Sequence, residues 1–281
     1  MPFAPALAHE PDAEEIALGA LVDAELAFAR MSAERGMRAA FLANFAEDGI
    51  AFEPAPVRLR EAWSARPAPA DPLAMRLDWK PAQAGVARSF DFGYTTGPFT
   101  LSSAAQPAQT QGVFFSVWRR NASGAWEVIL DVGIATPVVA DFVPLGASPR
   151  PHFKGRANPR DERRRLLERE SNAFGAGAAG LTPTGYAQLI AADIRLHRDG
   201  AAPIASRGDV AAEVARRMSR VWWTPLDARV SAASDMAVTW GRYREIDHVP
   251  QPRDGYYAHL WLRNAAGRWK LAYDIALPAG L

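Results

Sequence analysis

Residues 118–126 read WRRNASGAW, and residues 261–269 read WLRNAAGRW. An Asn-x-x-Gly turn between two tryptophan-bearing segments is typical of a β-hairpin, because glycine adopts the positive φ that a tight turn requires. Asp131 and Asp274 follow the two segments at the same spacing. The two regions, 143 positions apart, are therefore predicted to be copies of one structural unit.

The similarity continues upstream in the same order. WKP at 79–81 matches WTP at 223–225, and Leu-Val-x-x-Glu at 21–25 matches Leu-Leu-x-x-Glu at 166–170. The offset between copies drifts only from 143 to 145 residues, which small insertions in loops explain. The chain is therefore predicted to be a tandem duplication of one ancestral domain.

Each copy begins with helices and continues with strands. Leu18, Leu21, Val22, Glu25 and Phe28 recur on one face with the helical period, which predicts a first helix. A second helix, a short strand and a third helix follow. Alternating segments then predict strands at 75–79, 84–88, 91–101, 111–120 and 125–134. This order predicts an α+β fold in which helices cover one face of a curved antiparallel sheet.

The repeat divides the chain into three parts. We expect a first domain at 12–136, a connector at 137–162 and a second domain at 163–281. The connector is rich in proline and basic residues, so we expect it to be partly extended and to run over the surface. The first copy is net acidic and the rest net basic, which favours docking of the two copies as a pseudo-dimer.

The composition excludes several classes of protein. Of 281 residues, 49% are hydrophobic and 22% charged, which is ordinary for a globular protein. The absence of cysteine excludes disulfides, thiolate zinc sites and a cysteine nucleophile. The formal charge of +1 argues against nucleic acid as a partner. No apolar run is long enough to predict a membrane span, so we expect no membrane partner.

The start of the chain bears on the cell compartment. Ala6-Leu7-Ala8 resembles a signal-peptidase site, but no basic start and no apolar stretch precede it. We expect a cytoplasmic protein by default, and a periplasmic one if the start is truncated.

Together these motifs resemble the nuclear transport factor 2-like, or SnoaL-like, superfamily. The sequence looks most like an uncharacterised bacterial branch, through AELAF at 24–28 and DFGYTTG at 91–97. The resemblance implies a cone, in which a bent sheet wraps around helices and encloses a pocket at the wide end. Members include ketosteroid isomerases, polyketide cyclases, dehydratases and non-enzymatic binding modules, so the fold implies no single reaction.

Glu25 and Glu170 interrupt the apolar stripe of the first helix in each copy. Each is expected to face the cone interior, where burial raises a carboxyl pKa unless the group is hydrogen-bonded or paired. They are candidate ligand-binding residues, as a polar anchor or a general base. The alternative is a structural carboxylate that accepts bonds from backbone amides or pairs with an arginine such as Arg58 or Arg60.

Asp131 and Asp274 lie near the end of the last strand of each copy. Both alternate with apolar neighbours, so each is predicted to face a cavity or a packed sheet face. The resemblance to isomerases and cyclases, whose pocket carboxylates act as acid or base, makes them candidate catalytic residues. A structural or binding role is the alternative.

Two histidines distinguish the second copy. The counterparts of His197 and His259 in the first copy lie near Phe52 and Ser116. A strand histidine that faces a cavity can act as a base or a ligand. We take His259 as a candidate catalytic residue and His197 as a candidate ligand-binding residue. No paired-histidine spacing supports a metal site, so we expect neither metal nor cofactor.

Aromatic residues fall into repeated and unrepeated sets. The repeated tryptophans are expected to fill the core common to both copies. Tyr94, Trp240 and Tyr257 are not repeated and are therefore candidate ligand-binding residues.

These observations predict a tandem cone-fold protein that binds a small, mostly apolar organic molecule in one or both pockets. One alternative is a proton-transfer enzyme of the isomerase, cyclase or dehydratase type. The other is a non-catalytic scaffold with closed cones. We expect the pockets to be unequal, because only the second copy holds the strand histidines.

Overall fold

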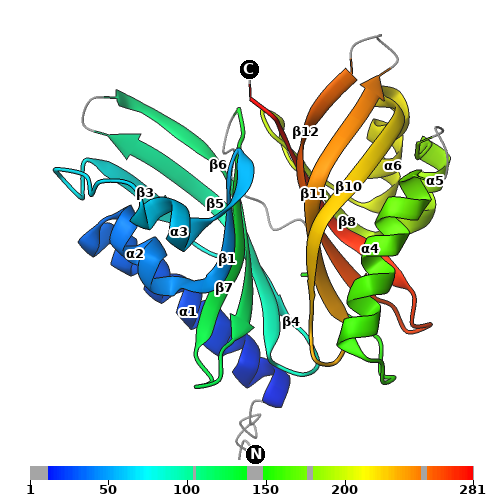
Figure 1. Ribbon diagram of the computed structural model, residues 1–281, viewed down its shortest axis with the longest axis horizontal. Helices are drawn as coiled ribbons and strands as arrows, with labels where there is room; N and C mark the ends of the chain where they lie inside the picture. Colours follow the sequence, from blue (N-terminus) through cyan, green and yellow to red (C-terminus); the bar gives the residue numbers. More distant parts are fainter. Residues whose placement is uncertain (1–11, 104–105, 138–147, 176–179, 248–251, 281) are drawn as a thin grey trace, which may run out of the picture.

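The computed structural model describes residues 12–103, 106–137, 148–175, 180–247 and 252–280. Two halves lie side by side, each with its sheet toward the other half and its helices on the outer flank (Figure 1). The predicted α+β class and the two tandem cone-shaped domains are confirmed. None of the helices in the described part is long and apolar enough to cross a membrane.

The first half opens with α1 (Ala13–Arg35), whose sequence defines both its ends. Asp12 accepts hydrogen bonds from the first turn and forms a capping box. The helix stops at Gly36, whose φ is +86° and where a Cβ would lie 2.3 Å from the carbonyl oxygen of Pro72. The buried face of α1 consists of Ala17, Leu21, Glu25, Phe28 and Ser32. A carboxylate therefore lies in the middle of an otherwise small or apolar stripe.

The first sheet is mixed. The later elements of this half are α2 (Met37–Asn44), β1 (Phe45–Glu53), β2 (Ala55–Arg58), α3 (Leu59–Ser64), β3 (Met75–Trp79), β4 (Gln83–Val86), β5 (Phe92–Ser103), β6 (Gln106–Arg120) and β7 (Trp126–Ala135). The strand order is β2-β1-β7-β6-β5-β3, with β4 also paired to β5. The strands from β5 to β7 form the predicted meander, but β1 pairs with β7 in parallel, so the sheet is not purely antiparallel.

The second half repeats this topology with one change. Its elements are α4 (Pro159–Gly175), α5 (Pro183–Leu189), β8 (Ile190–Arg198), β9 (Ile204–Ala205), α6 (Arg207–Arg217), β10 (Met218–Val230), β11 (Met236–Asp247), β12 (Pro252–Arg263) and β13 (Trp269–Pro278). The order β10-β11-β12-β13-β8-β9 matches the first sheet, and β8 again pairs in parallel with β13. One strand, β10, replaces β3 and β4, and its register shifts between Pro225 and Asp227.

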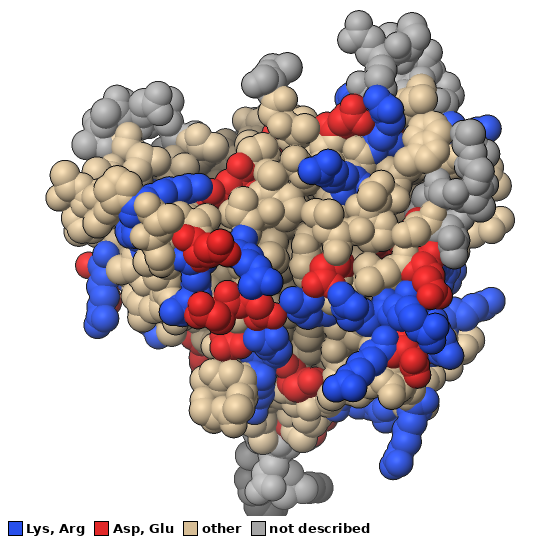
Figure 2. Space-filling model, viewed as in Figure 1, with Lys and Arg blue, Asp and Glu red and all other residues tan. Residues whose placement is uncertain are grey.

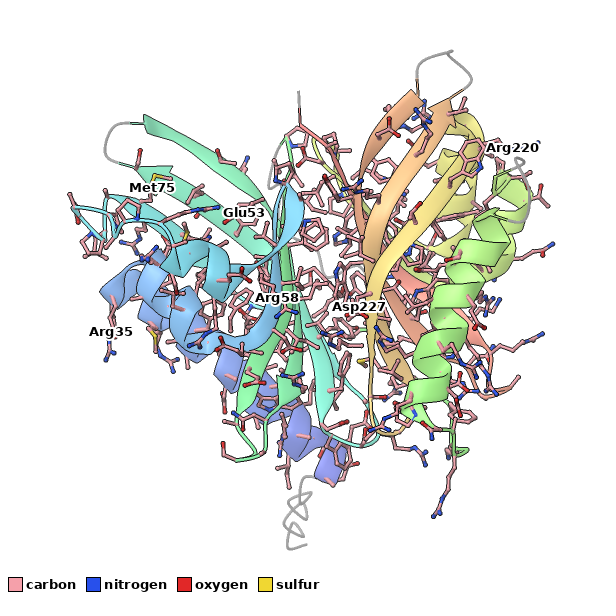
Figure 3. The ribbon with its side chains drawn as sticks, viewed as in Figure 1. Arg35, Glu53, Arg58, Met75, Arg220 and Asp227 are labelled. Carbon is pink, nitrogen blue, oxygen red and sulfur yellow. The ribbon has the colours of Figure 1, made fainter. Side chains whose placement is uncertain are left out.

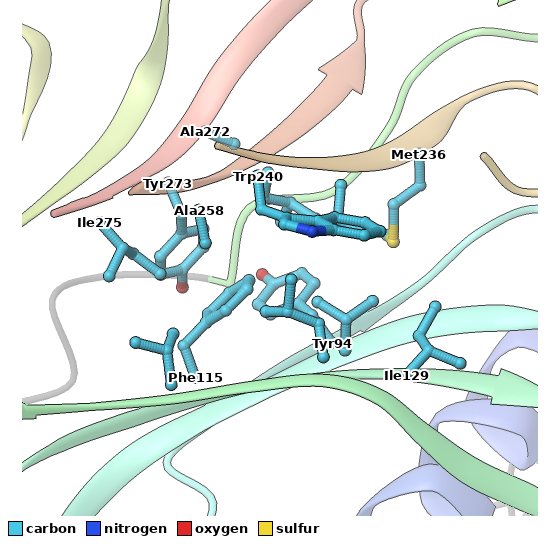
Figure 4. Packing of buried hydrophobic residues seen from close by; sticks show 14 of the residues in the cluster. Tyr94, Phe115, Ile129, Met236, Trp240, Ala258, Ala272, Tyr273 and Ile275 are labelled. Carbon is cyan, nitrogen blue, oxygen red and sulfur yellow. The ribbon is translucent and has the colours of Figure 1, made fainter. Parts of the chain in front are cut away.

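The two sheets share a core between the halves. Tyr94 and Phe115 of the first sheet pack against Tyr273 of the second, with ring centroids 5.2 and 5.1 Å apart (Figure 4). Charged and polar contacts surround this core. Asp48 pairs with Arg229 at 3.1 Å, and Figure 2 shows acidic and basic side chains intermixed over both halves. Each sheet is therefore covered on both faces, by its own helices and by the other sheet.

The described residues that precede α4 contact both halves. Pro149 is buried, and its carbonyl accepts a hydrogen bond from the Tyr94 hydroxyl at 2.7 Å. His152 N–H donates to the Arg263 carbonyl at 2.9 Å. The other residues from 148 to 158 are half-buried or exposed. Residues 138–147 and the signal-like Ala6-Leu7-Ala8 lie outside the described residues.

Candidate functional site

A buried carboxylate lies under each sheet. In the first half, Glu25 accepts hydrogen bonds from Trp79 Nε1 at 2.5 Å, Thr95 Oγ1 at 2.5 Å and Trp118 Nε1 at 3.1 Å. Burial raises the pKa of Glu25, and these hydrogen bonds oppose that rise. Glu25 is thus held by side chains of the sheet.

The arginines considered as partners of Glu25 lie elsewhere. Arg60 pairs with Glu47 at 3.2 Å. Arg58 is exposed and lies at the end of β2 beside the junction of the halves (Figure 3). The Glu25 carboxylate is therefore stabilised by neutral donors.

Glu170 of α4 occupies the equivalent place in the second half. It accepts hydrogen bonds from Thr239 at 2.6 Å, Tyr257 at 2.8 Å and Trp261 at 3.0 Å, and lies 2.9 Å from His259 Nδ1. A Glu–Thr–Trp set is thus common to both halves. Because it persists where the pockets differ, this set supports the fold, and the added tyrosine and histidine belong to the second half alone.

The first half holds a small apolar pocket of about 90 Å³. Asp131 supplies its carboxylate and accepts a hydrogen bond from Ser116 Oγ at 2.7 Å. Burial, and to a lesser degree the negative charge of Glu25, raise the pKa of Asp131 to about 7. The other lining residues are Phe28, Phe41, Leu77, Trp79, Phe99, Phe114 and Gly133. The pocket therefore presents one titrating carboxyl to an otherwise apolar space.

The second half holds a larger pocket of about 190 Å³. Trp223, Tyr243 and Tyr257 form an aromatic wall, while Leu196 and Val214 add apolar surface. The polar lining residues are Tyr186, Arg198, Asp199, Glu213, Arg217, Glu245, Arg253 and Asp274. The two pockets differ in size and polarity, as expected from the divergence of the copies.

Asp274 is the centre of the polar network in this second pocket. Arg198 holds it with two hydrogen bonds of 2.8 and 2.9 Å, and the Tyr186 hydroxyl donates to it at 2.6 Å. Burial favours the protonated acid, but the charges of Arg198 and His259 outweigh that effect and hold the pKa of Asp274 well below its ordinary value. Asp274 is therefore a carboxylate that its partners keep ionised.

His259 links Asp274 to the buried Glu170. Its Nε2 lies 3.4 Å from the Asp274 carboxylate, and its ring packs against Trp223 and Tyr257 with centroids 4.2 Å away. Burial lowers the pKa of His259, but the carboxylates of Asp274 and Glu170 raise it by more, so the net shift is upward. In the described part of the chain, no group of three carboxylate and imidazole side chains could hold a metal ion.

Three candidate ligand-binding residues face the core between the two sheets and not a pocket. His197 alternates with two pocket residues of β8, so its ring faces the other half and packs against Tyr273 at 5.7 Å. Burial and neighbouring arginines lower the pKa of His197 to about 3. Tyr94 and Trp240 belong to the core between the sheets. The structure thus brings Glu170, Tyr257, His259 and Asp274 together under the second sheet. His197, Tyr94 and Trp240 lie elsewhere, between the two sheets.

The sequence reasoning did not identify Tyr186, Arg198 or Tyr243 as pocket residues. A signal for two of them exists in the repeat. At the offset of 145 residues, Tyr186 corresponds to Phe41 and Arg198 to Glu53. Tyr186 adds a hydroxyl where the first copy has phenylalanine, and Arg198 reverses the charge of its counterpart, so both positions point to a role that the first copy lacks.

Comparisons with known proteins give a likeness of fold. No family model matches the chain, and no curated protein matches it. An NTF-2 like protein of unknown function from Shewanella oneidensis is 16% identical with a TM-score of 0.32, and the match covers 42% of this chain and 98% of that one. A ketosteroid isomerase-like protein from Erwinia carotovora atroseptica is 16% identical with a TM-score of 0.32, covering 42% and 95%. A computationally designed 17-OHP binder is 16% identical with a TM-score of 0.32, covering 41% and 92%.

Proposed function

We propose that this chain, a tandem of two NTF2-like cones, binds a small and mostly apolar organic molecule in the pocket of its second half. The observation that carries the proposal is the open space of about 190 Å³ beside the aromatic wall. A cavity of about 150 Å³ is enough to hold benzene. The pocket therefore has room for one substituted ring, and its polar groups would orient that ring.

The state of Asp274 favours binding over proton transfer in this pocket. A general base works best when its pKa lies near the working pH. The Asp274 carboxylate pairs with Arg198 and has a strongly lowered pKa, so it is a weak base. It serves better as a fixed anchor for the groups around it. An open pocket also supports binding over the closed-cone scaffold.

The binding proposal is tested by filling each pocket separately. Ala276 lines the second pocket, and Gly133 occupies the equivalent place in the first. We expect Ala276→Phe to abolish the thermal stabilisation that ring compounds give to the wild-type protein, because the new ring occupies their space. Gly133→Phe is the matched control and should leave that stabilisation intact. Equal stabilisation of wild type and Ala276→Phe would contradict the proposal.

A second candidate function, proton transfer in the first half, is inferred from Asp131. A carboxyl with a pKa of about 7 in an apolar pocket meets the requirement for a general base at neutral pH. Ser116 is the side chain that donates to it. The pocket of about 90 Å³ would accept only a small part of a substrate.

The titration of Asp131 predicts how stability depends on pH. The pKa of Asp131 is about 7 in the folded chain, and its ordinary value is 3.8. Between these two pH values the folded state therefore binds more protons than the unfolded state. The free energy of unfolding should therefore fall as the pH rises from about 4 to about 7. Asp131→Asn should remove this part of the slope in urea unfolding at several pH values. The equivalent Asp274→Asn should not flatten the slope, because the Asp274 pKa is shifted the other way. An unchanged slope in Asp131→Asn would contradict the raised pKa of Asp131.

A further inference from the structure

The Arg198 guanidinium uses only one of its two edges. Nη1 and Nη2 donate to the two carboxylate oxygens of Asp274, and Nη1 also donates to the backbone carbonyls of His197 and Asp274 at 3.1 Å. Within the described residues, nothing accepts a hydrogen bond from Nε–H or from the second Nη2–H. These two donors lie on the other edge of the guanidinium plane.

The unused edge is accessible from the second pocket. Arg198 lines that pocket, and its side chain is 23% exposed. Its unpaired Nε is not completely buried. Two parallel N–H groups of arginine match the two oxygens of a carboxylate.

Tyr243 supplies a further group to the same space. Its hydroxyl finds no partner in the described part of the chain, and its half-buried ring lines the pocket. The ring lies across Gly255, where a Cβ would be 2.5 Å from it. The absence of a side chain at Gly255 therefore leaves room for the tyrosine ring. Trp223 offers an apolar face in the same pocket.

Three of the four acidic side chains that line the pocket have basic partners, while Asp199 accepts a hydrogen bond from the Ala135 N–H. Glu245 pairs with Arg253 at 2.9 Å, and Glu213 lies 3.6 Å from Arg217, so both glutamates already have basic partners. Asp274 is shared between Arg198 and His259. Arg198 alone does not have to neutralise Asp274, which leaves it able to bind a second anion.

We propose that the ligand of the second pocket is a small ring-bearing carboxylate, bound side-on by Arg198 Nε and Nη2 and hydrogen-bonded by Tyr243. This inference rests on the proposed function and makes it more specific. It assigns Arg198 two partners, the fixed Asp274 and the incoming carboxylate. The ring of the ligand packs against Trp223.

The test compares two probes that share one ring, phenylacetate and 2-phenylethanol, in NMR titrations of the intact protein. We expect phenylacetate to bind about tenfold more tightly than the alcohol, because only the carboxylate accepts two charge-assisted hydrogen bonds. Arg198→Lys should lose that preference, since an ammonium group cannot present two parallel donors. Arg244→Lys is the matched control on β11, because Arg244 pairs with the exposed Asp254 outside this pocket, and it should keep the preference.

A measurement on the wild-type protein guards against misfolding of Arg198→Lys. The Arg198 Nε–H resonance should move on addition of phenylacetate and stay in place with the alcohol. Equal affinity for the two probes, or a preference that survives in Arg198→Lys, contradicts the proposal that Arg198 binds a carboxylate. Either result leaves the proposed function unaffected. Failure of both probes to bind, while other ring compounds stabilise the protein, also overturns the carboxylate. If no ring compound binds, the proposed function falls as well.

Discussion

Glu170→Ala is expected to lower the free energy of unfolding by about 3–5 kcal/mol, the range found when one partner of a buried charged network is removed. Glu170 is fully buried and interacts with four buried side chains, namely Thr239, Tyr257, His259 and Trp261. Alanine removes the acceptor that these buried groups share, although Trp261 still donates to Thr239 Oγ1 at 3.0 Å. Urea unfolding at pH 7 measures the loss.

The matched control for this variant lies on the same helix. Glu168 is largely exposed and 3.9 Å from Arg164, one turn before it. Glu168→Ala should change the free energy of unfolding by about 0.5 kcal/mol or less. A loss below about 1 kcal/mol in Glu170→Ala would mean that water or a neighbouring side chain replaces the carboxylate, contrary to the network described above.

Phe115→Asp is expected to prevent folding of the whole chain, not of one half. Phe115 is 1% exposed and lies between Tyr94 of its own sheet and Tyr273 of the other. An aspartate there places a carboxylate in the apolar core between the sheets, which costs several kcal/mol and consumes most of the stability of an ordinary domain. Circular dichroism and size-exclusion chromatography should show an unfolded or aggregated product.

Two further variants make this result specific. Thr110→Asp adds the same charge to an exposed position of the same strand and should fold normally. Phe115→Leu keeps an apolar side chain and should lose at most about 1.5 kcal/mol. A Phe115→Asp protein with the wild-type unfolding transition would show that the two halves are held together by other contacts.

The fold could be predicted because its determinants recur in the sequence. The repeated tryptophans and hairpin turns identify strands β5–β7 and β11–β13, and their order implies helices on one face. The parallel pairing of β1 with β7 could not be predicted, because alternation along a strand does not reveal the direction of its partner. One detail of register also depends on strand pairing. Strict alternation would place Leu271 and Tyr273 on the same face of β13, but the register shifts between Leu260 and Trp261, so Leu271 packs in the core under the helices and Tyr273 in the core between the sheets.

The site was harder to predict than the fold, for a physical reason. Both faces of each sheet are buried, one by helices and one by the other sheet, so alternating polarity does not distinguish the pocket from the core between the halves. His197 and Arg198 are adjacent on β8 but face opposite sides. Tyr94 and Trp240 belong to the core between the sheets, where the two facing surfaces need not be alike. Their lack of a repeated counterpart therefore did not indicate a pocket. A residue-by-residue comparison of the copies is the signal that would have identified Arg198.

The covalent link between the halves has a consequence for how such a protein can change. In a homodimer with two-fold symmetry, a single codon change alters both subunits, and any side chain that suits one cavity is imposed on the other. Here Ser116 and His259 occupy equivalent places but are encoded separately, so a substitution in one cavity does not alter the other. One half can then specialise in recognition while its sister keeps the scaffold stable, an asymmetry that no symmetric assembly of a single-cone chain can reach.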